Sequence, residues 1–314
     1  MNGNYWLCIS VTALLSFGWL AVRLGKRDMK PWSALLALPL SVLLGAVLGK
    51  LMYVALLFQR IWPRFGAEAL WRLKAAEFSF FGGGLGVILA MALTAKLTRQ
   101  KIKPFLSAFA PCGALLAAGF RAAEYFQGML GAGSYMESSV FTRFPFAIVN
   151  QWGEWHLAVF ALEALAALII ALVFALRKRE DRIPGLHMER TVFYLCVTQI
   201  FFESLRNQCM RWGFVRVEQV LCGMTVVGLI VYSCFQVKGL KGLKRFWPAL
   251  CSLLCIAILV LVEFGLDKFN FSTVFWYGVM IAVLCGFGAL ENVCVNRRLG
   301  EKWGHVGGSP PPNP

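Results

Sequence analysis

The chain has 314 residues, of which 59% are hydrophobic and 15% are charged, whereas about 25% of the residues in a soluble domain are charged. With a mean hydropathy of +0.66, this composition excludes an ordinary soluble domain and predicts a membrane protein with several spans. The formal net charge of +15 would suggest nucleic acid in a soluble protein, but the Lys and Arg residues form short clusters between apolar runs. Membrane topology explains such clusters, so we expect no nucleic-acid partner.

Apolar segments of suitable length predict an all-α, polytopic integral membrane protein, because a bilayer core needs about 20 apolar residues per helix. Nine segments qualify: 5–22, 33–56, 77–95, 104–120, 156–176, 189–205, 217–237, 246–264 and 271–290. The segment 189–205 is the least apolar of them.

The basic residues predict how these spans are oriented. The connections after odd-numbered spans carry roughly twice as many Lys and Arg residues as those after even-numbered spans, and basic residues accumulate on the cytoplasmic side. We therefore expect the N-terminus outside and the C-terminus in the cytoplasm. The longest connection, 121–155, then lies outside and forms a small extracytoplasmic cap.

Ten cysteines are scattered through the chain, nearly all in apolar segments, with no C-x-x-C pair and no His at metal-ligand spacing. This pattern is typical of small, buried hydrophobic side chains. We therefore expect no metal site.

Ionisable residues inside a membrane are costly, and their default interpretation is functional. On the predicted topology, seven of them fall near the outer ends of spans 2 to 6: Lys50, Glu77, Arg121, Glu124, Glu163, Glu203 and Arg206. They favour a polar chamber at the outer leaflet whose cations hold a phosphate. The alternative is a set of interfacial side chains and structural ion pairs, since Arg121 and Glu124, like Glu203 and Arg206, are three residues apart.

Two further features each have two interpretations. The run FGGGLG at 81–86 lets another backbone or a lipid headgroup come close, but small residues at helix crossings more often serve packing. His156, close to Glu154 in the chain, could carry protons, although an interfacial His that is hydrogen-bonded to water is more common.

The order of these features resembles that of the bacterial prolipoprotein diacylglyceryl transferases. The segments that carry the resemblance are GKLMY at 49–53, beside the family's G-R-x-G-Y; SFFGGGLG at 79–86, beside S-F-H-G-G-L-x-G; RAAEYFQGM at 121–129, beside G-R-x-G-N-F-x-N-G-E; FPFA at 144–147; HLAVFALE at 156–163, beside H-P-x-Q-L-Y-E; and QIFFESLR at 199–206, beside R-x-x-x-E-x-x-R, followed by a Q-x-L element at 219–221. No single segment is specific, but together they keep the family's order over roughly residues 5–237.

The resemblance implies a seven-span, transferase-like core over residues 1–237, with the cap loop at 121–155. The last two spans have no counterpart in the family, so we expect residues 238–295 to form an appended two-helix hairpin. Residues 296–314 end in GGSPPPNP, which is too polar and too rich in Pro to fold, and we expect a disordered cytoplasmic tail.

The family reaction moves a diacylglyceryl group from phosphatidylglycerol to the lipobox cysteine in the signal peptide of a prolipoprotein. The resemblance therefore implies a transferase of lipoprotein biosynthesis at the outer face of a bacterial cytoplasmic (plasma) membrane. Its partners would be phosphatidylglycerol, the prolipoprotein and membrane lipids. The reaction needs no metal and no organic cofactor.

Roles for individual residues follow from the resemblance. It implies catalytic roles for Arg121 and Arg206, which would hold the departing phosphate, and for Glu124 and His156. It implies substrate contacts from Tyr53, Lys50, Gly82, Gly83, Gln127, Glu163 and Glu203.

The sequence departs from the family at three motif positions, where Phe81 replaces a His, Glu124 an Asn and Gln199 an Arg. A phenyl ring accepts no proton. If the reaction persists, the proton acceptor is expected among four residues: Glu124, Glu163, His156 and Glu77.

Two other functions stay open. Phe81 favours a catalytically inactive lipid- or lipoprotein-binding membrane protein of the same fold. A transporter would account for the nine spans and the intramembrane charges, but the glycine run, the 121–129 element and the long external loop each occur once, so no inverted repeat is visible.

Overall fold

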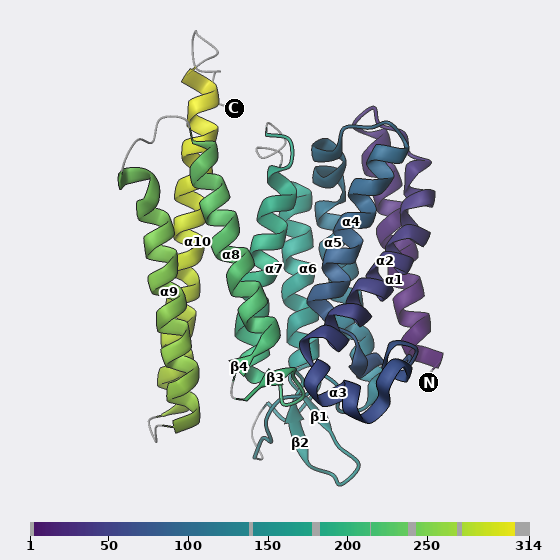
Figure 1. The fold of residues 1–314 in the computed structure, drawn as a ribbon, viewed down its shortest axis with the longest axis vertical. Coiled ribbons are helices and arrows are strands. Elements are labelled where there is room, and N and C mark those ends of the chain that lie inside the picture. Colours follow the sequence, from purple (N-terminus) through teal and green to yellow (C-terminus); the bar gives the residue numbers. More distant parts are fainter. Residues whose placement is uncertain are drawn as a thin grey trace. The chain divides into compact units, whose positions relative to one another are not determined.

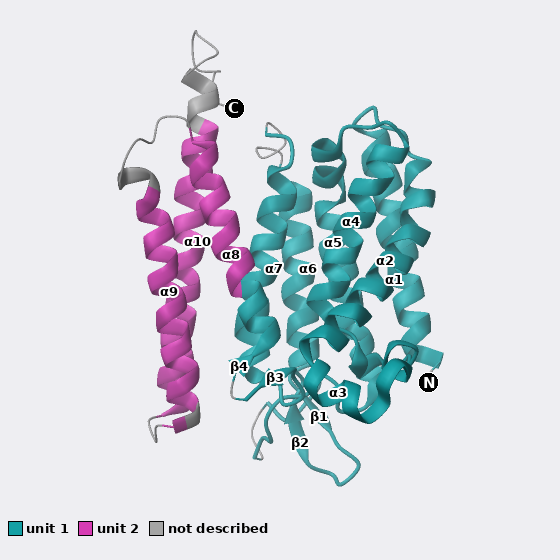
Figure 2. Ribbon diagram, viewed as in Figure 1, with its two compact units in different colours: residues 1–222 teal, residues 223–314 magenta. Residues whose placement is uncertain are grey.

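The computed structural model describes residues 3–137, 141–177, 183–213, 215–237, 243–268 and 272–304. The chain divides into two compact units, residues 1–222 and 223–314, which Figure 2 draws in different colours. Helix α8 (Val217–Gln236) begins in the first unit and continues into the second.

Unit 1 is a bundle of long helices with short elements at one end (Figure 1). Its long helices are α1 (Gly3–Gly25), α2 (Ser33–Leu56), α4 (Phe80–Leu97), α5 (Ile102–Ala123), α6 (Val159–Leu176) and α7 (Leu186–Leu205). Its short elements are α3 (Phe58–Phe65), the 3-10 helices η1 (Gly66–Leu70), η2 (Ala75–Glu77) and η3 (Glu124–Gln127), and the antiparallel pairs β1 (Ala147–Val149) with β2 (Trp155–Leu157) and β3 (Arg211–Trp212) with β4 (Val215–Arg216). The predicted all-α class is confirmed, apart from these two small hairpins.

Eight helices in the described part of the chain are long and apolar enough to cross a membrane. They correspond to eight of the nine predicted spans. The remaining segment, 189–205, lies in the 20-residue helix α7, whose composition is less apolar because it includes Glu189, Arg190 and Glu203. Helix α7 packs against α5 and α6, so its neighbours cover much of this polar sequence.

Helix α5 lies at the centre of unit 1, where it packs against α1, α4, α6 and α7. Its first half contributes Phe105, Phe109 and Cys112 to an apolar core that it shares with α1, α2 and α4. Its last turn instead carries the buried Arg121. The interior of unit 1 therefore changes along α5 from apolar to charged.

One end of unit 1, the cap end, gathers the start of α1, helix α3 and both hairpins (Figure 1). The connection from α5 to α6 contributes η3, β1 and β2, and the connection from α7 to α8 contributes β3 and β4. This grouping agrees with the predicted alternation of the first six spans. The side of the membrane on which the cap end lies stays a prediction.

The glycine run brings α4 close to α2. A Cβ on Gly82 would lie 2.8 Å from the carbonyl oxygen of Leu48, and a Cβ on Gly86 would overlap the backbone of Leu44. Gly83 leaves more room, because a Cβ on this residue would lie 3.8 Å from the nearest α2 atom, the Gly45 carbonyl oxygen. Helix packing thus accounts for Gly82 and Gly86, while substrate contact at Gly82 and Gly83 stays a prediction.

Unit 2 contains the rest of α8 and the helices α9 (Leu243–Lys268) and α10 (Thr273–Gly304), which pack against each other. Helices α9 and α10 occupy the region predicted as a hairpin. Helix α10 continues beyond residue 295 with Leu299 buried, so residues 296–304 are helical where the sequence predicted a disordered tail. Residues 305–314 lie outside the described residues.

The close approach of α2 and α4 predicts opposite effects for two alanine substitutions on one helix. Gly86→Ala should lower the free energy of unfolding by about 1–3 kcal/mol, because its methyl group overlaps the α2 backbone. Gly84→Ala, with no atom within 4 Å of its Cβ position, should raise it by about 0.5–1 kcal/mol through helix propensity. Thermal unfolding of both variants in detergent would measure this, and equal shifts would contradict the packing.

Candidate active site

A cluster of buried charged side chains lies where α5, α6 and α7 meet near the cap end. Arg121 is in the last turn of α5, Glu124 begins η3, and Glu163 is in the first half of α6. Glu203 is in the last turn of α7, and Arg206 is the C-cap residue that directly follows this helix. All five are at most 8% exposed. The sequence predicted that these residues lie at one level, and the structure brings them together.

The two arginines share the same two carboxylates. Arg121 donates to Glu124 Oε1 over 2.6 Å, and its Nε lies 2.9 Å from Glu163 Oε2 without hydrogen-bond geometry. Arg206 donates to Glu124 Oε2 and to Glu163 Oε2, both over 2.7 Å. Charge-assisted bonds of this kind are the strongest hydrogen bonds available to a buried side chain. The four residues form one closed ion-pair network, called the Arg–Glu network below.

Glu163 has one oxygen that the network does not use. Its Oε2 contacts both arginines, whereas its Oε1 is buried and has no hydrogen-bond partner among the residues that the structure describes. An unsatisfied buried acceptor is costly and is a frequent sign of function. Glu163 Oε1 is therefore the group in this cluster that is free to accept a hydrogen bond or a proton.

Gln199 and Phe80 complete the surroundings of Arg121. Gln199 accepts a hydrogen bond from the Arg121 guanidinium over 3.0 Å and donates one to Glu203 Oε2 over 3.0 Å. The guanidinium carbon of Arg121 lies 3.9 Å from the centre of the Phe80 ring. Such stacking favours a planar cation over an aromatic face. Both terminal nitrogens and one face of the Arg121 guanidinium thus contact other side chains of the protein.

The cap loop closes over the network at Gly131. This glycine has φ +74°, and a Cβ there would collide with Glu124 Oε2 and lie 2.9 Å from an Arg206 nitrogen. Asn207 fastens the same loop by donating from its backbone to Ala132 O over 3.0 Å and from its side chain to Gly133 O over 2.6 Å. Only glycine combines this backbone conformation with so close an approach.

A second cluster holds the predicted residues Lys50 and Glu77. Lys50 donates to Glu77 Oε2 over 3.0 Å and to the backbone oxygen of Arg72 over 2.6 Å, and Arg72 lies 3.4 Å from Glu77 Oε1. The Lys50 nitrogen is also 5.6 Å from the centre of the Tyr53 ring. The predicted single level of charge is therefore made of two separately paired clusters.

His156 lies in the hairpin of β1 and β2, called the cap hairpin below, where it is paired with Ile148 of β1. Its ring nitrogens lie 3.2 Å from Gly133 O and 3.4 Å from the Asn150 amide nitrogen, and the Glu154 carboxylate is 3.9 Å away. The structure shows no direct contact between His156 and the Arg–Glu network within the described residues. Its partners hold the cap hairpin together.

Glu218 is a buried carboxylate that the sequence analysis missed. Its Oε1 accepts hydrogen bonds from Ser79 Oγ and Phe80 N, both over 2.8 Å, and from Phe81 N over 3.4 Å. It thereby fixes the N-terminus of α4, where a negative charge is favourable, and holds the backbone of the Phe80 that stacks on Arg121. The signal was available, since Glu218 is an ionisable residue at the start of the predicted span 217–237.

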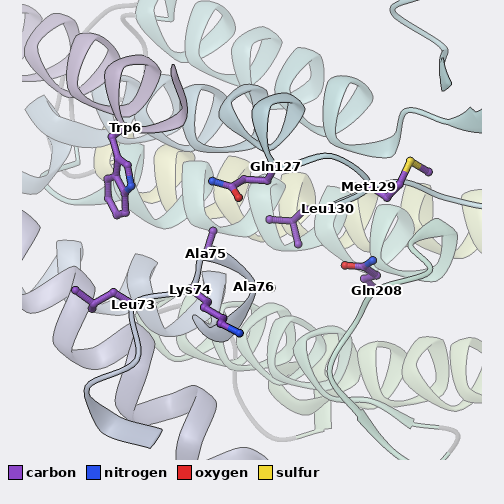
Figure 3. A pocket seen from close by; sticks show the side chains of 9 residues that line it. All are labelled: Trp6, Leu73, Lys74, Ala75, Ala76, Gln127, Met129, Leu130 and Gln208. Carbon is purple, nitrogen blue, oxygen red and sulfur yellow. The ribbon is translucent and has the colours of Figure 1, made fainter. Parts of the chain in front are cut away.

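A pocket of about 360 Å³ opens at the cap end. It is lined by nine residues that Figure 3 shows as sticks: Trp6, Leu73, Lys74, Ala75, Ala76, Gln127, Met129, Leu130 and Gln208. Gln127 was predicted to contact substrate, and the other lining residues were not singled out. Trp6 is in α1, and the others lie in the connections between the long helices, where sequence periodicity gives no signal.

The donor set in the described part of the chain includes no group of three or more His, Cys, Asp or Glu residues that could hold a metal ion. Cys234 and Cys294 have sulfur atoms 3.7 Å apart, and all ten cysteines are free thiols.

Comparison with known proteins gives two matches. A sequence model of the prolipoprotein diacylglyceryl transferase family matches residues 4–234. The chain is also 21% identical over 217 residues to a phosphatidylglycerol–prolipoprotein diacylglyceryl transferase from Clostridium novyi (strain NT), an alignment that covers 67% of this chain and 81% of that protein. The family match, residues 4–234, includes both charged clusters and ends before α9.

The sharing of carboxylates predicts energetic coupling between Arg206 and Glu124. Arg206→Met should lower the free energy of unfolding by about 3–5 kcal/mol, because it leaves buried carboxylates without a partner. Adding Glu124→Gln removes one of those charges and should recover about 1–3 kcal/mol. A double-mutant cycle from chemical unfolding in detergent would measure this coupling.

The matched control is Arg60→Met, on the exposed residue Arg60 of α3, which should change the free energy of unfolding by less than about 0.5 kcal/mol. Strictly additive effects of Arg206→Met and Glu124→Gln would show that the network does not exist in solution.

Proposed function

Since the chain belongs to the prolipoprotein diacylglyceryl transferase family, we propose that it transfers a diacylglyceryl group from phosphatidylglycerol to the lipobox cysteine of a prolipoprotein. The cap end then lies at the outer face of a bacterial cytoplasmic membrane, with the N-terminus outside. The basic residues of the connections support this orientation, and the apolar outer faces of the helices would give the acyl chains access from the bilayer.

The reaction exchanges one bond for another. The cysteine sulfur forms a C–S bond to the terminal carbon of the diacylglyceryl group, and the C–O bond from that carbon to the phosphate breaks. The bonding electrons leave with the phosphate oxygen as glycerol phosphate, and the thiol gives up its proton. The protein must therefore supply a proton acceptor for the thiol and a positive environment for the phosphate.

Glu163 is the best proton acceptor among the four residues that the sequence left open. Both oxygens of Glu124 are bonded to arginines, and Glu77 is paired with Lys50 and Arg72. His156 is engaged in the cap hairpin. Within the described part of the chain, Glu163 Oε1 is the one carboxylate oxygen of these residues that is buried and lacks a hydrogen-bond partner. This free oxygen is the observation that carries the proposal.

The arginines hold Glu163 in place. Each guanidinium is already neutralised by carboxylates, so a phosphate could bind Arg121 or Arg206 only by displacing Glu124 or Glu163. The expected role of these two arginines as a phosphate clamp therefore requires an exchange of ion pairs. In the structure as it stands, they orient the acceptor and balance the charge that it carries.

Phe81 favours one alternative function. Its backbone nitrogen lies 3.4 Å from the Glu218 carboxylate at the start of α4, but its side chain carries no group that can transfer a proton. A lipid- or lipoprotein-binding protein that keeps the fold without catalysis would tolerate this residue. It would bind phosphatidylglycerol and release no glycerol phosphate.

The proposal predicts the effect of Glu163→Gln in cells depleted of their own diacylglyceryl transferase. Wild-type protein should restore the thioether-linked diacylglyceryl group on a reporter prolipoprotein, and Glu163→Gln should reduce its rate of formation about 10²–10⁴-fold. The exposed Glu154→Gln serves as the matched control and should act like the wild type.

The membrane fraction should contain all three proteins at similar levels, with similar melting temperatures after purification. Full modification of the reporter by Glu163→Gln would remove Glu163 as the acceptor. An unmodified reporter with inserted, folded wild-type protein would favour the binding function.

A further inference from the structure

The cationic side chains at the cap end differ in whether a carboxylate of the protein is already paired with them. Arg121 and Arg206 are neutralised by Glu124 and Glu163, and Lys50 is paired with Glu77. Lys74 is exposed, and its ammonium group makes no hydrogen bond or ion pair with any residue that the structure describes. It is the cation of the pocket at the cap end, and it is available to an anionic ligand from outside the protein.

The rest of the pocket is chemically suited to a small amphipathic ligand. The amide side chains of Gln127 and Gln208 can each donate and accept hydrogen bonds, whereas Trp6 and Leu130 supply apolar walls (Figure 3). The volume of about 360 Å³ falls in the usual range of ligand sites, about 300–1,000 Å³. One cation, two amides and an apolar wall fit a phosphate, a pair of hydroxyl groups and the start of a lipid tail.

The pocket is built from the same chain segments as the two charged clusters. Gln127 is in the same 3-10 helix as Glu124, and Gln208 follows Arg206 by two residues. On the other side, Lys74 caps the 3-10 helix that ends in Glu77, and the Glu77 backbone nitrogen donates to Lys74 O over 2.9 Å. A ligand in this pocket is therefore positioned by short segments that are themselves anchored in the buried ion pairs.

We infer that this pocket binds the glycerophosphate headgroup of an anionic phospholipid, with Lys74 holding the phosphate and Gln127 and Gln208 hydrogen-bonding to the headgroup. This inference deepens the proposed function and rests on it for the identity of the lipid. Lys74 serves as a substrate-binding residue that selects negative over zwitterionic headgroups. Lys74 would thereby supply the positive charge for the phosphate, because both guanidinium groups of the Arg–Glu network are paired with carboxylates.

Two ligands share this chemistry, the lipid headgroup and soluble glycerol phosphate, and both are used as probes. The purified full-length chain is placed in phosphatidylcholine nanodiscs, and phosphatidylglycerol binding is measured in competition with phosphatidylethanolamine or with glycerol phosphate. The variants are Lys74→Glu, Lys74→Arg and, as a matched charge reversal, Lys101→Glu. Lys101 is exposed and precedes α5, whose other end carries Arg121.

The wild type should prefer phosphatidylglycerol, and Lys74→Glu should weaken its binding about tenfold by replacing a charge-assisted hydrogen bond with a repulsion. Lys74→Arg should stay within about threefold of the wild type and Lys101→Glu should match it. Displacement by glycerol phosphate that depends on Lys74 would show that the headgroup alone is recognised. Displacement by lipid only, again dependent on Lys74, would add the apolar wall to the site. Equal phosphatidylglycerol affinity in the wild type and Lys74→Glu would overturn the inference.

The same preparations separate this inference from the proposed function. If Lys74 controls phosphatidylglycerol binding but no diacylglyceryl group is transferred to a lipobox peptide, the site stands and the transferase activity fails. If Lys74→Glu transfers the group with unchanged binding and unchanged KM for phosphatidylglycerol, the activity stands and this site is wrong.

Discussion

Two buried arginines share two buried carboxylates, and the cap end of unit 1 is organised around these contacts. Arg121 of α5 and Arg206 at the end of α7 both contact Glu163 of α6, and Glu124 binds the same two guanidinium groups. Charges so far from water are tolerated only together, because removing one leaves its partners uncompensated. The network therefore fixes three helices relative to one another, and the cap loop closes over it at Gly131.

In the proposed diacylglyceryl transfer, the Arg–Glu network and the pocket that contains Lys74 have different roles. In the proposed reaction, the two arginines hold Glu163, whose Oε1 has no hydrogen-bond partner among the described residues, so the network is better suited to orient a proton acceptor than to bind a phosphate. In the same proposal, the positive charge for the phosphate comes from Lys74, which lines the pocket at the cap end. Burial makes a carboxylate a better proton acceptor, and an exposed cation is accessible to an anionic ligand that arrives from outside.

Much of the fold could be predicted from the sequence, because runs of about 20 apolar residues identify spans. The Arg121–Glu124 pair could also be predicted, since residues three apart share one face of a helix. Glu203 and Arg206 have the same spacing without pairing, because α7 ends at Leu205 and the extended backbone of Arg206 directs it to Glu124 and Glu163. Which distant residues pair with each other depends on the folded arrangement and leaves no periodic signal in the sequence. The same holds for the pocket, most of whose lining residues lie in connections.

The most direct test of this account is the stoichiometry of the reaction with purified protein. The full-length chain is mixed with phosphatidylglycerol and a lipobox peptide, and both products are measured over time. The account predicts one glycerol phosphate released for each thioether formed on the peptide cysteine. Bound phosphatidylglycerol with neither product, from protein shown to be folded, would contradict it.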